Sequence, residues 1–301
     1  MPYPLPPTLS PSRVTAFCDC ALAYRFANLD RLPEPPSPHA TKGTLVHAAL
    51  ELLFQLDPDA RTREAAGRCL DEAAATMTAD PEFLLLGLDD DATAAFVADA
   101  HRLLDGYFAM EDPTQVHAIG LELKLTAEVG GVQVTGIIDR LDRQPDGSFL
   151  VVDYKTGRAP SERYEQGKLL GVDTYALLCE RVFGVRPAAV RLLYLGDGVA
   201  ITCRPSDRTS RFIEQKVGAV WQSIQRANAR DSFAPRPGRL CDWCAFRTWC
   251  PAFGGDPDEA RRYGEELRIA RRAEAARAGD DDAVPLPFPT EATQVAGAAA
   301  R

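Results

Sequence analysis

Apolar and polar residues alternate along residues 116–129, and two further runs rich in Val and Ile follow within residues 131–157. Alternation is typical of a half-buried strand, and Val and Ile favour extended backbone, so the pattern predicts three successive strands. Residues 188–204, AAVRLLYLGDGVAITCR, predict a second strand pair around a Gly-containing turn. The middle of the chain is therefore predicted to be rich in β-structure.

Apolar residues recur at helical spacing on either side of these strands. Ser10 followed by Pro11 is an N-cap and first-turn signature, which predicts a helix through SRVTAFCDCALAYRF. Residues 60–112 are rich in Ala and acidic residues, with breaks near Pro81 and residues 89–91, and are interpreted as an inserted helical layer. Further helices are predicted over residues 43–54, 161–183 and 207–229.

The ends of the chain differ in composition from its middle. Prolines crowd residues 1–9, which are predicted to be a flexible leader, and residues 30–42, which are predicted to be a surface loop. Residues 10–253 are predicted to form one catalytic domain with a helical insertion at about residues 57–112. Residues 254–301 are charged, Ala-rich and finally Pro-rich, which predicts a helix to about Ala278 and a largely disordered tail.

Turn-forming residues 144–148, QPDGS, separate the second and third strands and predict a hairpin centred near Asp146. Pairing about that centre places Asp139 opposite Asp153, with Cβ atoms roughly 5 Å apart, and Lys155 follows Asp153 on the same face. Two facing carboxylates repel each other, and a divalent cation between them would explain the arrangement. A lysine beside them can hold a phosphate oxygen or stabilise developing negative charge.

These are the parts needed for metal-assisted phosphodiester hydrolysis. Charged residues near hairpins also serve solubility, so the hairpin by itself leaves a purely structural alternative open.

Asp139 followed by Asp153-Tyr154-Lys155 resembles the PD-(D/E)XK nuclease superfamily, and the phrases GIIDRLD and VVDYKTG are similar to its RecB-type exonuclease family. The resemblance implies an α/β restriction-endonuclease-like core, with a central mixed sheet flanked by helices. It also implies that Asp139, Asp153 and the carbonyl of Tyr154 bind Mg²⁺ or Mn²⁺, and that Lys155 acts in catalysis.

Two helices add candidates to this site. In GTLVH, His47 fits the position of a further metal ligand in RecB-like nucleases, although a lone histidine on such a helix is more often an ordinary core residue. Tyr175 fits a tyrosine that the family places four residues after a glutamine, and it is assigned a catalytic role on that resemblance. Gly171 stands at the glutamine position, and Gln166 lies nearby at a different spacing. Glu122 is a weaker acidic candidate.

The segment CDWCAFRTWCP places Cys241, Cys244 and Cys250 close together. Three thiolates so close indicate a soft metal centre, and a zinc site would need a second pair of ligands that does not follow. One branch of the RecB-like family, including AddB-type subunits and CRISPR-associated exonucleases, joins one earlier cysteine to three later ones around a [4Fe-4S] cluster. That pattern favours Cys20 over Cys18 as the fourth ligand, and the cluster would act as a C-terminal iron-sulfur staple over residues 241–250.

The net charge of −9 is unevenly distributed. Residues 57–112 have a balance of −10, whereas residues 181–250 have a balance of +7, so a basic segment could follow phosphates. No apolar run approaches the roughly 18 residues of a spanning helix, and the start lacks the features of a signal peptide. A cytoplasmic location with no membrane partner is predicted, in which the eight cysteines are thiols or metal ligands.

The predicted function is a metal-dependent DNA exonuclease, acting on single-stranded DNA or DNA ends in repair or recombination. No ATPase phosphate-binding loop occurs, so unwinding would need a partner helicase. One alternative is a catalytically weakened iron-sulfur DNA-binding subunit of a helicase-nuclease complex, to which Gly171 points. Another is a redox or zinc module whose hairpin carboxylates have no catalytic part.

Overall fold

The computed structural model describes residues 2–160 and 165–278. The chain divides into two compact units: Met1–Asp19 with Glu34–Ser232, and Cys20–Pro33 with Phe233–Arg301. A single domain over residues 10–253 was predicted from the sequence. The second unit forms because the segment that begins at Phe233 packs with the short stretch that begins at Cys20.

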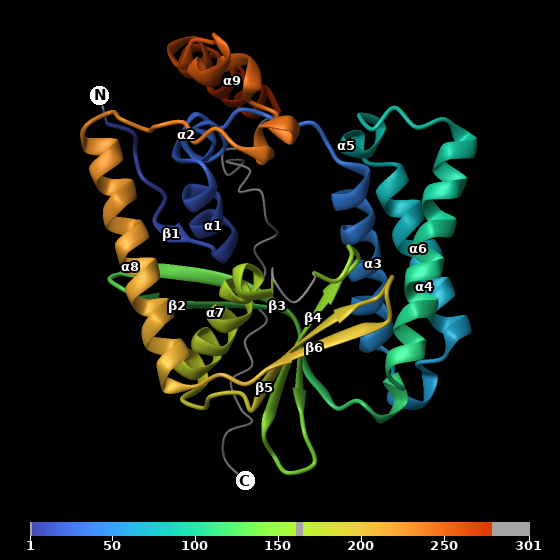
Figure 1. The fold of residues 1–301 in the computed structure, drawn as a ribbon. Helices are drawn as coiled ribbons and strands as arrows, with labels where there is room; N and C mark the ends of the chain where they lie inside the picture. Colours follow the sequence, from blue (N-terminus) through green and yellow to red (C-terminus); the bar gives the residue numbers. More distant parts are fainter. Residues whose placement is uncertain (1, 161–164, 279–301) are drawn as a thin grey trace. The chain divides into compact units, whose positions relative to one another are not determined.

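A mixed sheet organises the first unit (Figure 1). β3 is antiparallel to β2 and β4 and parallel to β1, β4 is parallel to β5, and β5 is antiparallel to β6. β2 pairs along the length of β3, while β1 and β4 pair with different ends of it. The strands are β1 Thr8–Leu9, β2 Ala118–Val129, β3 Val132–Arg143, β4 Phe149–Lys155, β5 Ala189–Tyr194 and β6 Val199–Cys203.

The hairpin register predicted from the sequence is confirmed. Arg140 pairs with Val152, and Arg143 pairs with Phe149, so paired positions are centred on Asp146. The turn is closed by the side chain of Asp146, which accepts hydrogen bonds from the amide and hydroxyl of Ser148 at 2.9 and 2.7 Å. A polar turn between two β-favouring runs was enough to fix which residues face each other.

The proline-rich start does not behave as the flexible leader that its composition suggested. Leu9 is fully buried in β1, and Tyr3 exchanges two hydrogen bonds of 2.8 and 2.9 Å with the side chain of Asn228. Proline disfavours helix, but it permits the extended backbone that a short parallel edge strand requires.

Helices α3, α4 and α6 pack against one another and form a core with side chains of β4. α3 begins earlier than predicted, because Pro38 occupies its first turn and so starts a helix where a loop was expected. The helices of this layer and its connections are α3 Pro38–Gln55, α4 Arg63–Thr78, α5 Pro81–Leu84 and α6 Asp90–Met110, with 3-10 turns at Pro58–Ala60 and Pro113–Gln115.

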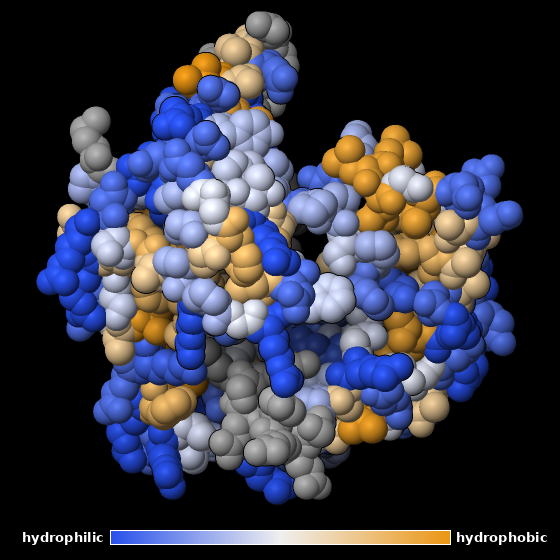
Figure 2. Space-filling view, turned by 45° about the horizontal axis from the view of Figure 1, so that its top comes forward, coloured by the Kyte–Doolittle hydropathy of each residue, from blue (hydrophilic) through white to orange (hydrophobic). Residues whose placement is uncertain are grey.

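An apolar patch lies on the surface of this helical layer. Leu84 and Leu85, at the end of α5, are 67% and 73% exposed, and the upper right of Figure 2 shows the orange surface of this region.

The other helices of the first unit are α1 Pro11–Asp19, α7 Glu165–Phe183 and α8 Asp207–Ala229. α7 lies against β2 and β3, and α8 packs on α7 and α1. α8 has the bounds predicted from its apolar spacing, and Ser206 caps it by accepting a hydrogen bond from the Thr209 amide at 3.3 Å. The predicted helix over residues 161–183 is observed from Glu165, and residues 161–164 lie outside the described part.

The second unit consists of short helices and one long one. The helix predicted from Ser10 is interrupted at Cys20, whose extended backbone separates α1 from α2. Arg25 pairs with Asp30 at 3.0 Å and donates to the Pro257 carbonyl at 2.8 Å, which ties the early segment to the late one. The elements are α2 Ala21–Arg25, the π-helix Phe26–Asp30, 3-10 turns at Arg239–Trp243, Arg247–Trp249 and Pro251–Phe253, and α9 Pro257–Ala278.

Candidate active site

Asp139 and Asp153 lie at facing positions of β3 and β4, next to the Arg140–Val152 pair. Burial raises the pKa of Asp139 above its usual range, and the negative charge of Asp153 raises it further. The two carboxylates therefore interact, as the sequence predicted. A buried carboxylate beside another acid needs a counter-charge to remain ionised at neutral pH.

Glu122 extends this pair to a third strand. It lies in β2 between two residues that pair with the neighbours of Asp139, so Glu122 and Asp139 face each other. The backbone of Glu122 has a φ of 41°, in the left-handed region that side chains other than glycine rarely adopt. Burial, together with Asp139, Glu51 and Asp153, raises the pKa of Glu122 to about 8. From the sequence, Glu122 is only a weak candidate for the site, and nothing in the sequence indicates its left-handed backbone.

His47 reaches this row of acids from α3. Its Nδ1 atom lies 3.6 Å from Asp139 Oδ2 and 3.9 Å from Glu122 Oε1. Its Nε2 atom lies 3.1 Å from the carbonyl oxygen of Tyr154. One donor atom each from His47, Glu122 and Asp139 lies within 4.8 Å of the others, close enough to share one ion. The structure thus brings together the histidine and the acid that the sequence placed about ninety residues apart.

The backbone of Tyr154 joins the same site from β4. Its amide donates a hydrogen bond of 2.7 Å to Asp139 Oδ2, and its carbonyl faces His47. The adjacent Lys155 forms an ion pair with Asp153. Burial would lower the pKa of Lys155, but the carboxylates of Asp153 and Asp139 outweigh it and raise the pKa above its ordinary value. Lys155 therefore carries a positive charge at neutral pH.

Tyr175 approaches the acids from α7. Burial raises its pKa, and Asp153, Asp139 and Glu122 raise it further, so its hydroxyl stays protonated and can donate a hydrogen bond. Gly136 of β3 permits this approach, because a Cβ there would lie 2.9 Å from Tyr175 Cε1. Gly171, one turn earlier, offers no side chain, and the side chain of Gln166 lies outside the described residues.

The donor set suits a hard divalent cation. Carboxylate and carbonyl oxygens are the ligands that Mg²⁺ and Mn²⁺ prefer, and one imidazole is compatible with Mn²⁺. A cation among Asp139, Glu122 and Asp153 would also neutralise the repulsion that raises the pKa of two of them. The residues present therefore fit a divalent metal site.

A second cluster of ligands lies in the other unit. Burial raises the pKa of the Cys244 thiol, and the charges of Cys20, Cys241 and Cys250 raise it further, so the four sulfurs share one neighbourhood. Two backbone amides point at sulfurs: that of Arg236 at Cys20, at 3.4 Å, and that of Gly238 at Cys241, at 3.3 Å.

The chemistry of these donors suits a soft metal centre. Thiolates are ligands of both zinc ions and iron-sulfur clusters, and the four cysteines offer one thiolate each.

The three aromatic residues of this segment differ in exposure. Phe246 is 4% exposed and lies on Phe26 at 5.7 Å between ring centroids, and Trp249 stacks on Tyr263 at 5.9 Å. Trp243 is 88% exposed. Two of the three rings thus pack against other rings of the same unit, and the third faces solvent.

Comparison with known proteins identifies the fold and the chemistry together. The family model of the PD-(D/E)XK nuclease superfamily matches residues 8–251. The chain belongs to the PD-(D/E)XK nuclease superfamily. It is therefore a hydrolytic nuclease, of a class that uses divalent metals and acts on DNA.

Two phage proteins and one solved structure are similar to this chain. The chain is 24% identical over 277 residues to the Gene 69 protein of Mycobacterium phage D29, covering 82% of this chain and 97% of the relative. It is 26% identical over 139 residues to the Gene 69 protein of Mycobacterium phage L5, covering 44% of each. A crystal structure named "Putative exonuclease" from Eubacterium rectale has a TM-score of 0.51 at 12% identity, covering 79% of this chain and 87% of the other, which shows a shared fold.

The mixed sheet and its flanking helices confirm the predicted α/β class. No described helix is long and apolar enough to cross a membrane.

Proposed function

We propose that this nuclease is a Mg²⁺- or Mn²⁺-dependent DNA exonuclease of the RecB-like type, acting on single-stranded DNA or DNA ends in repair or recombination. One observation supports it most: His47, Asp139 and the Tyr154 backbone converge within hydrogen-bonding or near-coordinating distance, beside the Asp153–Lys155 ion pair. A helix and two strands supply these groups, so their convergence depends on the whole fold.

Each residue has a defined part in this proposal. His47, Asp139, Asp153 and the carbonyl of Tyr154 would hold the cation, with Glu122 as a further acid. When bound, such an ion neutralises charge on the phosphate and makes water more nucleophilic. Lys155, held positive by its carboxylate neighbours, would orient the attacking water and stabilise the charge that develops on a phosphate oxygen. Tyr175 would donate a hydrogen bond to the substrate from α7.

The cysteine group is proposed to hold a [4Fe-4S] cluster through Cys20, Cys241, Cys244 and Cys250. Three thiolates close together in the sequence, one earlier cysteine and the amides aimed at two of the sulfurs support this cofactor. Cys20 has its sulfur near the amide of Arg236, whereas Cys18 belongs to α1. The cluster would close a loop of more than two hundred residues, so it would stabilise the fold without entering the hydrolysis.

A second candidate is a DNA-binding subunit with weak turnover, favoured by Gly171 in place of the family's glutamine. Unwinding by a partner helicase belongs to either proposal, since the sequence has no ATPase phosphate-binding loop.

The test is cleavage of end-labelled single-stranded DNA in Mn²⁺ by anaerobically purified protein. Wild type should release short products from the ends, and Asp153→Ala should release none above background. Glu128→Ala is the matched control, because it removes an exposed acid from β2 of the same sheet. DNA binding without cleavage by the wild type would favour the weak-turnover subunit, and neither binding nor cleavage would reject both.

A further inference from the structure

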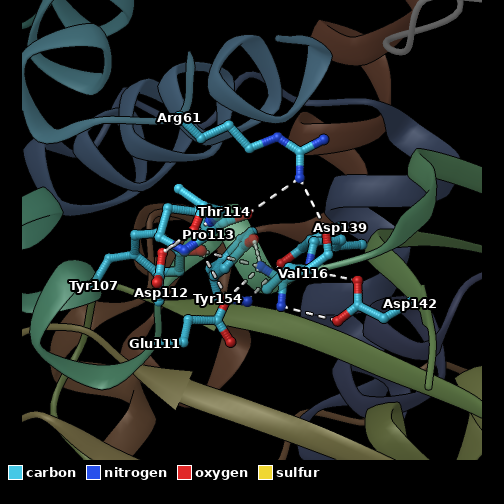
Figure 3. Close-up of polar contacts among 11 residues, drawn as sticks. Arg61, Tyr107, Glu111, Asp112, Pro113, Thr114, Val116, Asp139, Asp142 and Tyr154 are labelled. Carbon is cyan, nitrogen blue, oxygen red and sulfur yellow. Dashed lines mark hydrogen bonds and ion pairs between the residues drawn. The ribbon is translucent and has the colours of Figure 1, made fainter. Parts of the chain in front are cut away.

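Arg140 is fully buried, although it lies next to Asp139 in β3. Its guanidinium makes a two-pronged contact with Asp142, at 2.8 and 3.0 Å, and a 2.5 Å contact with Glu111. It also donates to the hydroxyls of Tyr154 at 2.7 Å and Tyr107 at 3.4 Å. Figure 3 shows Tyr107, Glu111, Asp142 and Tyr154 gathered around one point, with Arg61 entering from another element.

The charges in this cluster balance. Arg140 and Arg61 oppose Asp142 and Glu111, and both guanidinium groups lie over the ring of Phe54, at 4.5 and 4.8 Å. Arg61 is fixed by backbone carbonyls, including that of Val116 at 2.9 Å. Taking charged groups out of water is costly before they pair, and apolar residues of similar volume often give an equally stable core. Stability alone is therefore a weak reason for this cluster.

Tyr154 connects the cluster to the active site. Its hydroxyl is held by Arg140, while its backbone lies between the carboxylate of Asp153 and the amine of Lys155. The same residue donates its amide to Asp139 and turns its carbonyl toward His47. A strand end with one anchored side chain cannot rotate or slide without moving all of these groups.

We propose that Arg140 is a positioning residue that acts through the Tyr154 hydroxyl, fixing the end of β4 so that Asp139, the Tyr154 carbonyl and His47 converge on one cation. This inference rests on the proposed metal-dependent nuclease function. A catalytic site requires its groups to be held to within about 0.5 Å, and in this proposal Arg140 provides that support although it is not a metal ligand. Removing the anchor should weaken the metal site more than the fold.

Two tyrosine variants separate these effects. Tyr154→Phe keeps the ring on β4 and removes the hydroxyl that Arg140 contacts. Tyr107→Phe removes the other tyrosine hydroxyl that Arg140 contacts, and Tyr107 lies on α6. Both tyrosines are buried. Tyr154→Phe leaves Arg140 short of one acceptor, and Tyr107→Phe leaves Arg140 short of an acceptor and Glu111 short of a donor. Mn²⁺ binding is measured by electron paramagnetic resonance, together with thermal unfolding and the Mn²⁺ dependence of DNA cleavage.

Tyr154→Phe should weaken Mn²⁺ binding by roughly 10-fold or more, the effect of losing an outer hydrogen-bond partner of a metal site. Tyr107→Phe should lower the unfolding temperature about as much as Tyr154→Phe does, yet leave the Mn²⁺ affinity within about 2-fold of wild type. Arg140→Lys keeps the charge without the two-pronged geometry, and it should reproduce the loss of affinity seen in Tyr154→Phe.

Equal loss of Mn²⁺ affinity in both tyrosine variants would overturn the proposal in favour of general destabilisation. Wild-type affinity in Tyr154→Phe and Arg140→Lys would overturn it outright. These outcomes leave the proposed nuclease function intact if the wild type still binds Mn²⁺ and cleaves DNA. A wild type that binds no Mn²⁺ at the His47 site would instead reject the function and, with it, the positioning role.

Discussion

The two candidate metal sites of this chain are assembled in different ways. The carboxylate site comes from strand register, since Glu122, Asp139 and Asp153 occupy facing positions on three adjacent strands. The cysteine group comes from chain return, since residues 241–250 come back to Cys20 across more than two hundred residues. The first site is held by the hydrogen bonds of the sheet, whereas three of the cysteines in the second lie at short 3-10 turns.

This difference suggests separate roles: the carboxylate site for the chemistry and the cysteine group for the stability of its unit. The sheet can place its acids before any ion binds, and the ion then relieves the repulsion that raises the pKa of Glu122 and Asp139. The four thiols have no comparable framework of strands, so the bound centre would supply part of the folding free energy of their unit. Loss of metal should therefore disable the first site and loosen the second.

The largest expected effects come from substitutions that disable one of the two sites and leave the other intact. Asp139→Asn should reduce Mn²⁺-dependent DNA cleavage by at least about 100-fold, because it removes a ligand and an acceptor for the Tyr154 amide. Its iron content and visible absorbance should equal those of the wild type. Cys244→Ser should lose the broad iron-sulfur absorbance and lower the unfolding temperature, while the folded fraction still binds Mn²⁺.

Two results would break this comparison. Loss of iron from Asp139→Asn would make the sites one cooperative structure. A colourless wild type with one zinc ion per chain would replace the iron-sulfur assignment with a zinc site.

A smaller effect is expected from pH in the absence of divalent ions. The pKa of Glu122 is raised from 4.5 to about 8, so between these values the folded chain keeps a proton that the unfolded chain has released. Stability should therefore fall as pH rises through this window, and Asp139 acts in the same direction. Differential scanning fluorimetry should show a shallower fall for Glu122→Gln, and Mn²⁺ should flatten the wild-type curve. Equal slopes for the two proteins in metal-free buffer would refute the effect.

The smallest effect concerns the contact that brings Tyr175 to the site. Gly136→Ala places a methyl group 2.9 Å from Tyr175 Cε1 and Leu178 Cδ1, so α7 must shift. We expect a loss of roughly 1–3 kcal/mol in the free energy of unfolding, measured by urea denaturation, with a decrease in turnover larger than the change in Mn²⁺ affinity. Gly131→Ala is the glycine control, since it has open space, although its φ of 81° also costs stability. An unchanged turnover in Gly136→Ala would remove Tyr175 from the site.

The sequence predicted the parts of the site that depend on local rules. Turn residues 144–148 set the hairpin, and the hairpin set the partners Asp139 and Asp153. The place of His47 came from resemblance, because its distance to Asp139 depends on how α3 packs on the sheet. The left-handed backbone of Glu122 and the buried contacts of Arg140 could not be predicted. The first depends on how three strands pack, and the second depends on how α3 and α6 lie against the sheet.

The proline-rich segments differ from their predictions for a related reason. The prolines near residues 2–7 predict a flexible leader, and Pro38 falls in a predicted surface loop, yet they precede a paired strand and start a helix. The residue restricts backbone angles, and only the neighbouring contacts decide whether the restricted segment is ordered.

The central claim is that a sheet-built group of acids and one imidazole binds the catalytic cation. Anomalous diffraction from crystals soaked in Mn²⁺, recorded on both sides of the manganese edge, tests it most directly. We expect one peak in contact with His47 and Asp139, near the Tyr154 carbonyl, and none at the cysteine group. A peak at the cysteines alone, or no peak at His47 in crystals of an active enzyme, would contradict it.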